Sequence, residues 1–299
     1  MNSNGNVSVS EPNEEIIQNK HKEEKIMPLV TSKEMLLKAQ KGGYAVGAFN
    51  AENMEMVKAI IQAAEELKAP VMIQTTPSTV KYGTVETYAA IVAAEAAKAS
   101  VPVCLHLDHG SSFELAMQAM HAGYTSVMID GSKLDFEDNI RETRRVADVA
   151  AALDIPCEAE LGKVGGKEDD LEAEADTNTD PQEAKEFVER TGVTSLAVAI
   201  GTAHGFYVGT PVLDKERLSE IREVVDIPLV LHGASGLSDE DVSDCVKRGI
   251  CKVNFATELR AAYSRAVKET FAENENTIDP KAYGCLLYTS PSPRDYAAS

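Results

Sequence analysis

The sequence predicts a single (β/α)8 TIM barrel of the α/β class, because a strand-then-helix unit recurs eight times along its 299 residues. The strand segments are short runs of Val, Ile, Leu and Ala, which suit parallel strands covered on both faces. No Gly-x-Gly-x-x-Gly fingerprint follows the first strand, which disfavours a doubly wound open sheet. The length and the 43% hydrophobic content suit one large barrel or two smaller domains, and the repeat favours the barrel.

The predicted elements alternate along the chain. A capping pattern, Thr31-x-x-Glu34, opens a first helix that ends at Gly42-Gly43. The predicted strands are the short apolar runs at residues 44–50, 70–76, 100–106, 125–130, 155–161, 195–200, 227–232 and 250–254. Helical spacing of apolar residues follows most of them, at residues 56–64, 88–99, 115–120, 146–153, 218–225 and 259–271.

Two further helix starts carry explicit caps. Ser111-x-x-Glu114 opens the helix that stops at Gly123. Asp180-Pro181-x-Glu183 opens another, with proline at its favoured first position. Before this second cap, residues 162–179 are predicted to form a long, Gly-rich, acidic loop.

The two ends of the chain depart from the repeat. Residues 1–26 are polar and without periodicity, and we interpret them as a disordered extension. Residues 27–284 form the predicted barrel. Residues 285–299 have no helical period and resemble an artefactual tail.

The net charge of −19 argues against a nucleic-acid partner and against binding to anionic membranes. No apolar run has membrane-spanning length, and the N-terminus lacks the apolar core of a signal peptide. The five cysteines show no metal-ligand spacing, and we interpret them as reduced packing residues of a cytoplasmic protein. An anionic substrate would need a local positive site, such as a metal ion or helix N-termini.

Polar residues stand where the predicted strands end, and a barrel brings those ends to one face. In chain order they are Asn50, Thr76, Asp108 with His109, Asp130, Glu160, His204, His232 and Asn254. His109, His204 and His232 would offer three neutral nitrogens, which is a catalytic zinc arrangement when a fourth position is open. Asp130 and Glu160 would either hydrogen-bond the ligands or hold a second divalent or monovalent cation. We interpret His106 and His121 as structural residues.

The loops after the seventh and eighth strands predict a phosphate site. Residues 233–236 are Gly-Ala-Ser-Gly, and residues 254–257 open a helix. Small residues let backbone N–H groups approach an anion, and a helix N-terminus favours one. A carboxylate in the glycine-containing segment 165–170 could serve as a base if that loop closes.

Seven motifs together resemble the class II, zinc-dependent ketose-bisphosphate aldolases, which include fructose- and tagatose-bisphosphate aldolases. The motifs lie in residues 106–114, 126–131, 158–162, 165–169, 199–205, 229–235 and 252–257, and the resemblance covers about Met27 to Tyr283. It implies a lyase of carbohydrate metabolism and glycolysis that acts on a phosphorylated ketose and forms a homodimer or homotetramer.

The resemblance also implies residue roles. His109, His204 and His232 would hold the catalytic zinc, with Asp130 and Glu160 at a second metal position. Asp108 would exchange the proton of the substrate C4 hydroxyl, and Glu168 the proton on the dihydroxyacetone-phosphate carbon. The dihydroxyacetone-phosphate end would contact Gly205, Gly233, Ala234, Ser235, Asn254, Phe255, Ala256 and Thr257, and Asn50 and Thr76 would lie on the aldehyde side.

The chain departs from the family pattern at one place, and two alternative functions stay open. After Tyr283 the family continues with a helix that carries an arginine for the distal phosphate, and here the segment 285–299 stands in its place. A barrel metallohydrolase is one alternative, although it would more naturally use a His-x-His pair on an early strand. A non-catalytic subunit that stabilises a partner aldolase is the other. The sequence does not distinguish fructose from tagatose bisphosphate.

Overall fold

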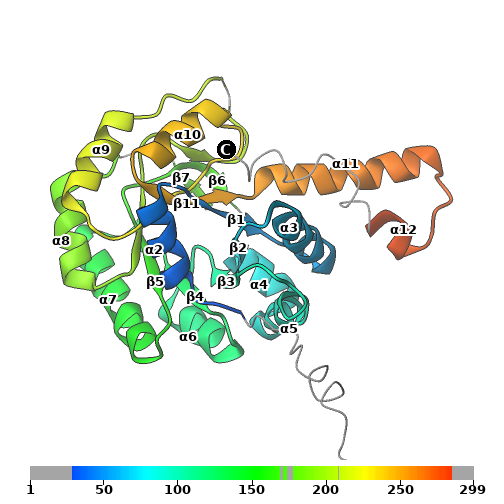
Figure 1. The fold of residues 1–299 in the computed structure, drawn as a ribbon, viewed down its shortest axis with the longest axis horizontal. Helices are drawn as coiled ribbons and strands as arrows, with labels where there is room; N and C mark the ends of the chain where they lie inside the picture. The colour runs from blue at the N-terminus through cyan, green and yellow to red at the C-terminus, as the bar shows by residue number, and fades with distance from the viewer. Residues whose placement is uncertain (1–28, 169–170, 174–177, 208, 285–299) are drawn as a thin grey trace, which may run out of the picture.

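The computed structural model describes residues 29–168, 171–173, 178–207 and 209–284. Eight parallel strands close into a barrel in the order β1-β11-β10-β8-β5-β4-β3-β2, which confirms the predicted fold (Figure 1). The strands are β1 (Val46–Asn50), β2 (Val71–Thr75), β3 (Val103–Leu107), β4 (Ser126–Ile129), β5 (Cys157–Leu161), β8 (Ser195–Val198), β10 (Leu229–Leu231) and β11 (Ile250–Phe255). The predicted extension at 1–26 and the tail at 285–299 lie outside the described residues.

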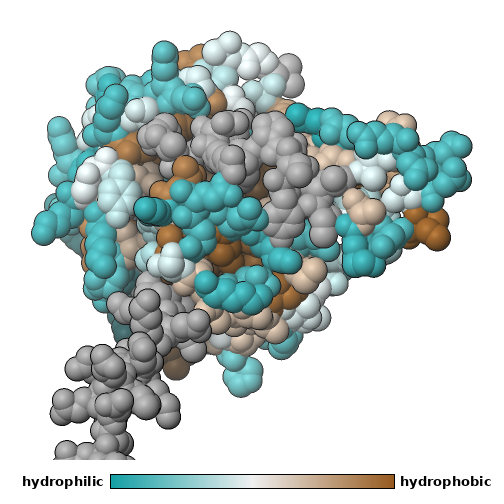
Figure 2. Space-filling view, turned by 45° about the vertical axis from the view of Figure 1, so that its right-hand side comes forward, coloured by the Kyte–Doolittle hydropathy of each residue, from teal (hydrophilic) through white to brown (hydrophobic). Residues whose placement is uncertain are grey.

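Helices surround the barrel, and α11 with α12 projects beyond it (Figure 1). They are α2 (Ser32–Gly42), α3 (Met54–Leu67), α4 (Pro77–Gly83), α5 (Val85–Ala96), α6 (Phe113–Ala122), α7 (Phe136–Ala152), α8 (Pro181–Thr191), α9 (Lys215–Val224), α10 (Asp239–Lys247), α11 (Thr257–Glu273) and α12 (Pro280–Gly284). Hydrophilic residues cover most of the projecting part (Figure 2). No helix of the described residues is both long and apolar enough to cross a membrane.

Local capping agrees with the sequence at one helix and differs at two. Asp180 caps α8 by accepting hydrogen bonds from the backbone N–H groups of Gln182 and Glu183. The cap of α6 is Ser112, not Ser111, since Ser112 is the extended residue whose side chain accepts from the Leu115 N–H. Thr31 precedes α2 without a side-chain cap.

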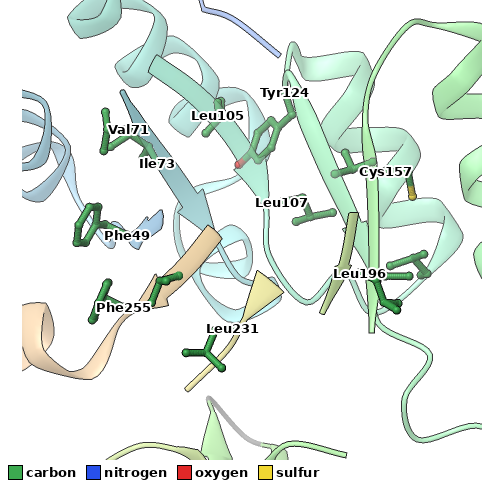
Figure 3. Close-up of a cluster of buried hydrophobic side chains, with 14 of the residues drawn as sticks. Phe49, Val71, Ile73, Leu105, Leu107, Tyr124, Cys157, Leu196, Leu231 and Phe255 are labelled. Atoms are coloured by element: carbon green, nitrogen blue, oxygen red, sulfur yellow. The ribbon is translucent and has the colours of Figure 1, made fainter. Parts of the chain in front are cut away.

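Alternation along the strands divides the core into two parts. One set of strand residues packs against the helices, including Phe49, Val71, Ile73, Leu105, Leu107, Leu196, Leu231 and Phe255 (Figure 3). The other set faces the barrel interior, where Ala48, Met72, Cys104 and Cys251 form a separate apolar cluster with Met35 and Leu36 of α2. This inner cluster fills the end of the barrel interior that lies next to α2.

The predicted loop at 162–179 is wrong in its first part. Residues of this segment form β6 (Gly165–Glu168) and β7 (Leu171–Ala173), an antiparallel pair. β6 also pairs in parallel with β9 (Ala203–His204), with Gly166 opposite His204. The physical reason is long-range pairing. The sequence of β6 has little strand pattern of its own, and the segment becomes a strand because its backbone pairs with β9.

Candidate active site

The three predicted ligand histidines meet at one end of the barrel. His109 follows β3, His204 lies in β9, and His232 follows β10. The ring centroid of His109 lies 5.0 Å from that of His204 and 4.6 Å from that of His232. Among the described residues, one ligand atom from each of the three lies within 4.8 Å of the others. His109 has a left-handed backbone, with φ of 48°, which is uncommon for a residue other than glycine.

A carboxylate fixes the orientation of His109. Its Nδ1 lies 2.8 Å from Asp130 Oδ2, so Nε2 is the nitrogen left for the other two histidines. Ser132 in turn donates to Asp130 Oδ1 from its backbone N–H at 3.0 Å and its hydroxyl at 2.7 Å. Burial favours a higher pKa for Asp130, but the hydrogen bonds from His109 and Ser132 outweigh it and hold this pKa well below its ordinary value.

His232 has the opposite orientation. Its Nε2 lies 3.0 Å from Glu158 Oε1, and its Nδ1 lies 3.2 Å from Glu160 Oε2. Burial and the neighbouring His109 lower the pKa of His232, but Glu158 and Glu160 outweigh them and raise it to about 9. The surroundings of this ring therefore favour positive charge.

These residues fit a divalent metal ion. His232 Nδ1 and Glu160 Oε2 are buried and form a close pair at 3.2 Å that does not have hydrogen-bond geometry. Two buried polar atoms held this close without a hydrogen bond between them could both bind one cation. Three imidazoles suit zinc. Asp130 and Glu160 also form a second group with His109 that could hold a cation.

Asp108 lies beside this cluster and is held by three side-chain amides. Oδ2 accepts from Asn50 Nδ2 at 3.0 Å and from Gln74 Nε2 at 3.2 Å, and Oδ1 accepts from Asn254 Nδ2 at 3.1 Å. The carboxylate is 1% exposed. A carboxylate ordered in this way can take a proton from a substrate hydroxyl.

A small, partly open cavity lies beside His204. It is lined by Asn50, His204, Gly205, Gly233, Ser235, Asn254, Ala256, Thr257 and Arg260. Seven of these lining residues were predicted to bind substrate: Asn50, Gly205, Gly233, Ser235, Asn254, Ala256 and Thr257.

Three other predicted substrate residues lie elsewhere or contribute no side chain to the cavity. The side chains of Ala234 and Phe255 pack in the core, so only their backbone could reach a ligand. Thr76 caps α4 by accepting from the Thr79 N–H. For Glu168, the structure describes the backbone in β6, and its side chain lies outside the described part.

Sequence reasoning missed Arg260 and Gln74. Arg260 lies one turn into α11, and its Nε donates to Glu52 Oε1 at 2.8 Å. It places a guanidinium, ion-paired with Glu52, at the edge of the cavity. The sequence feature that could have identified Arg260 is its position just after the predicted phosphate loop. Gln74 lies two residues before Thr76 and therefore on the same inner face of β2.

The comparisons with known proteins agree with this geometry. The family model for fructose-bisphosphate aldolase class-II matches residues 30–290. The chain belongs to this family. This family match favours an aldolase over the alternative of a barrel metallohydrolase.

Solved structures of similar proteins include the YdjI aldolase from Escherichia coli K12, which is 39% identical with a TM-score of 0.78 over 90% of this chain and 94% of that one. A candidate fructose-1,6-biphosphate aldolase from Coccidioides immitis is 33% identical, with a TM-score of 0.77 over 85% and 89% of the two chains. The fructose-bisphosphate aldolase Fba from Campylobacter jejuni, at 23% identity and a TM-score of 0.70 over 83% of each chain, shares the fold.

Substitution of Gly166 should disturb the histidine cluster through β9. A Cβ at Gly166 would lie 2.2 Å from the His204 carbonyl oxygen, and its φ is +84°. We expect Gly166→Ala to push β6 from β9, displace His204 and weaken zinc binding by about 10-fold or more, as loss of support around a ligand does. Zinc competition with a chromogenic chelator measures this.

Gly192→Ala is the matched control, since Gly192 also has positive φ, +71°, but open space around its Cβ position. It should cost about 1 kcal/mol of folding free energy and leave zinc affinity unchanged. Equal zinc affinity in both variants would show that β6 does not support His204.

Proposed function

We propose that this chain reversibly cleaves a ketose 1,6-bisphosphate, fructose or tagatose, into dihydroxyacetone phosphate and glyceraldehyde 3-phosphate with the help of zinc. The observation that carries the proposal is the adjacency of a buried, amide-held Asp108 to three converging imidazoles at the mouth of a cavity. Membership of the aldolase family and the likeness to the YdjI aldolase support it.

His109, His204 and His232 would hold the zinc, because each can present one nitrogen to a common point. Zinc held there would act as a Lewis acid for the negative charge left on the ketose fragment when the C3–C4 bond breaks. Asp130 keeps the ring of His109 in place. Asp130 and Glu160 would also hold a second cation.

Asp108 would accept the proton of the C4 hydroxyl during cleavage and return it during condensation. Its three amide donors fix the orientation of the carboxylate, as a positioned general base requires. Glu168 would exchange the proton on the dihydroxyacetone-phosphate carbon. Its place in β6, next to the strand that carries His204, supports this role.

The phosphate end of the ketose fragment would bind at residues 233–235 and 254–257, with Gly205. The loops are tied together, since the Ala256 N–H donates to Ser235 Oγ at 3.3 Å. α11 begins at Thr257, which lines the cavity, so backbone N–H groups that have no acceptor within the helix would lie near this place. Arg260 adds a cation at the edge of the same cavity.

Arg260→Ala should raise KM for the bisphosphate by about 10- to 100-fold with a smaller change in kcat, because a charge-assisted hydrogen bond to phosphate contributes about 1.5–3 kcal/mol. Steady-state kinetics measures this. Arg265→Ala, further along α11, is the control and should leave KM unchanged. An unchanged KM for Arg260→Ala would remove Arg260 from substrate binding.

The deciding experiment is a coupled cleavage assay with fructose 1,6-bisphosphate and tagatose 1,6-bisphosphate as separate substrates. The proposal expects turnover of at least one. No turnover of either by zinc-loaded protein would favour the alternative, a non-catalytic subunit, and would direct the search to a partner aldolase. The intact Asp108 network favours catalysis.

We also propose that the enzyme works in the cytoplasm in carbohydrate metabolism or glycolysis, as a homodimer or homotetramer. Family membership supports the metabolic role. The projecting α11 and α12 would offer surface for self-association (Figure 1). Light scattering of the purified protein tests the oligomeric state.

A further inference from the structure

A charged layer lies inside the barrel below the histidine cluster, and the proposed reaction does not use it. It consists of Glu158 on β5, Lys252 on β11 and His106 on β3, with exposed fractions of 1%, 0% and 0%. Lys252 Nζ donates to both oxygens of Glu158, at 2.9 and 3.0 Å. It also lies 3.3 Å from His106 Nε2.

This layer is continuous with the lower end of the barrel. His106 Nδ1 lies 2.8 Å from Ser126 Oγ, which lies 2.9 Å from Ser32 Oγ on α2. Burial, followed by the positive charge of Lys252, holds the pKa of His106 well below its ordinary value. His106 is therefore neutral, and its Nε2 is an acceptor that helps to position the Lys252 ammonium.

Stability alone is a poor explanation of the Glu158–Lys252 pair. A buried ion pair loses the hydration of both groups, and replacing such a pair with apolar residues is often neutral or stabilising. The layer below it is apolar and includes Met72, Cys104 and Cys251. What distinguishes Glu158 is its upper contact, since its Oε1 also faces His232 Nε2 at 3.0 Å.

We propose that Glu158 is a positioning residue that fixes His232 as a metal ligand through Nδ1. This inference depends on the proposed zinc site. Neutral imidazole carries one N–H and one free lone pair, so a proton held on Nε2 by Glu158 leaves the Nδ1 lone pair facing the cluster. The other tautomer would point an N–H at the metal. Lys252 holds the carboxylate in place by contacting both of its oxygens.

Two double variants separate the hydrogen bond from the charge. Glu158→Gln with Lys252→Met, and Glu158→Leu with Lys252→Met, both remove the ion pair, and neither leaves a buried charge unpaired. Only the glutamine keeps an oxygen that can accept from His232 Nε2. Zinc affinity, measured by chelator competition, should stay within about 10-fold of wild type for the glutamine variant. It should fall by about 10- to 100-fold for the leucine variant.

Two readouts exclude a merely structural effect. The metal-free melting temperatures of the two variants should agree, and the visible spectrum of the cobalt-substituted protein should change in the leucine variant only. Equal zinc affinity and equal spectra in the two variants would overturn the inference while leaving the proposed function intact. Failure of wild type to bind zinc would overturn both.

A measurement on wild type keeps the inference testable if the variants fail to fold. Nitrogen-15 NMR of histidine-labelled, zinc-loaded protein reports which ring nitrogen carries the proton. The inference expects the proton of His232 on Nε2 and the metal on Nδ1. A proton found on Nδ1 of His232 would contradict it.

Discussion

Asp108→Asn should lower kcat by about 10²- to 10⁴-fold, the range expected when a general base is removed. The amide is nearly the same size, so the cavity and the histidines should keep their places. The substituted amide cannot accept the proton of the C4 hydroxyl. The side chains that hydrogen-bond to Asp108, those of Asn50, Gln74 and Asn254, are also amides and cannot act as the base instead. Zinc affinity should change by only a few-fold.

Asp135→Asn is the matched control for this substitution. Asp135 is exposed at the start of α7 and makes no side-chain cap hydrogen bond there. The same chemical change should therefore leave both kcat and zinc affinity unaltered. If Asp108→Asn keeps more than about a tenth of wild-type kcat, general-base catalysis by Asp108 is excluded.

His204→Ala should abolish tight zinc binding and cleavage activity together. His204 is only half-buried, so the fold should tolerate its loss better than that of His109 or His232. Loss of a residue that merely supports a ligand costs about 10- to 100-fold in metal affinity, so loss of a ligand should cost more than about 100-fold. Metal content after dialysis and the coupled cleavage assay measure the two effects.

His121→Ala controls for the loss of an imidazole as such. His121 is exposed in the last turn of α6, where its removal costs only a few tenths of a kcal/mol of helix stabilisation. Zinc content and activity should match wild type. Wild-type zinc content in His204→Ala would mean that this ring is not a ligand.

The barrel and its mouth were predictable from sequence because both depend on short-range pattern. Aliphatic runs separated by helical periods predict parallel strands, and the closed fold then places every strand end on one face. Asp108, His109 and His232 follow directly from that rule. His204 lies four residues past its predicted strand, and the structure brings it to the cluster through β9.

The polar residues inside the barrel do not follow from the expectation that strand bodies are apolar. Gln74, His106, Glu158 and Lys252 each lie two residues before a polar strand end, and a strand repeats its side-chain direction every two residues. Their inward direction could therefore have been predicted from the sequence. The pairing of β6 with β9 could not have been predicted, because it joins segments about forty residues apart and depends on the tertiary fold.

X-ray absorption at the zinc edge of the purified protein tests the central claim most directly, because it counts the imidazole rings around the ion. We expect one zinc per chain with three imidazoles in wild type and two or fewer in any zinc retained by His204→Ala. A wild-type spectrum with no imidazole scattering, or with sulfur ligands, would contradict the account.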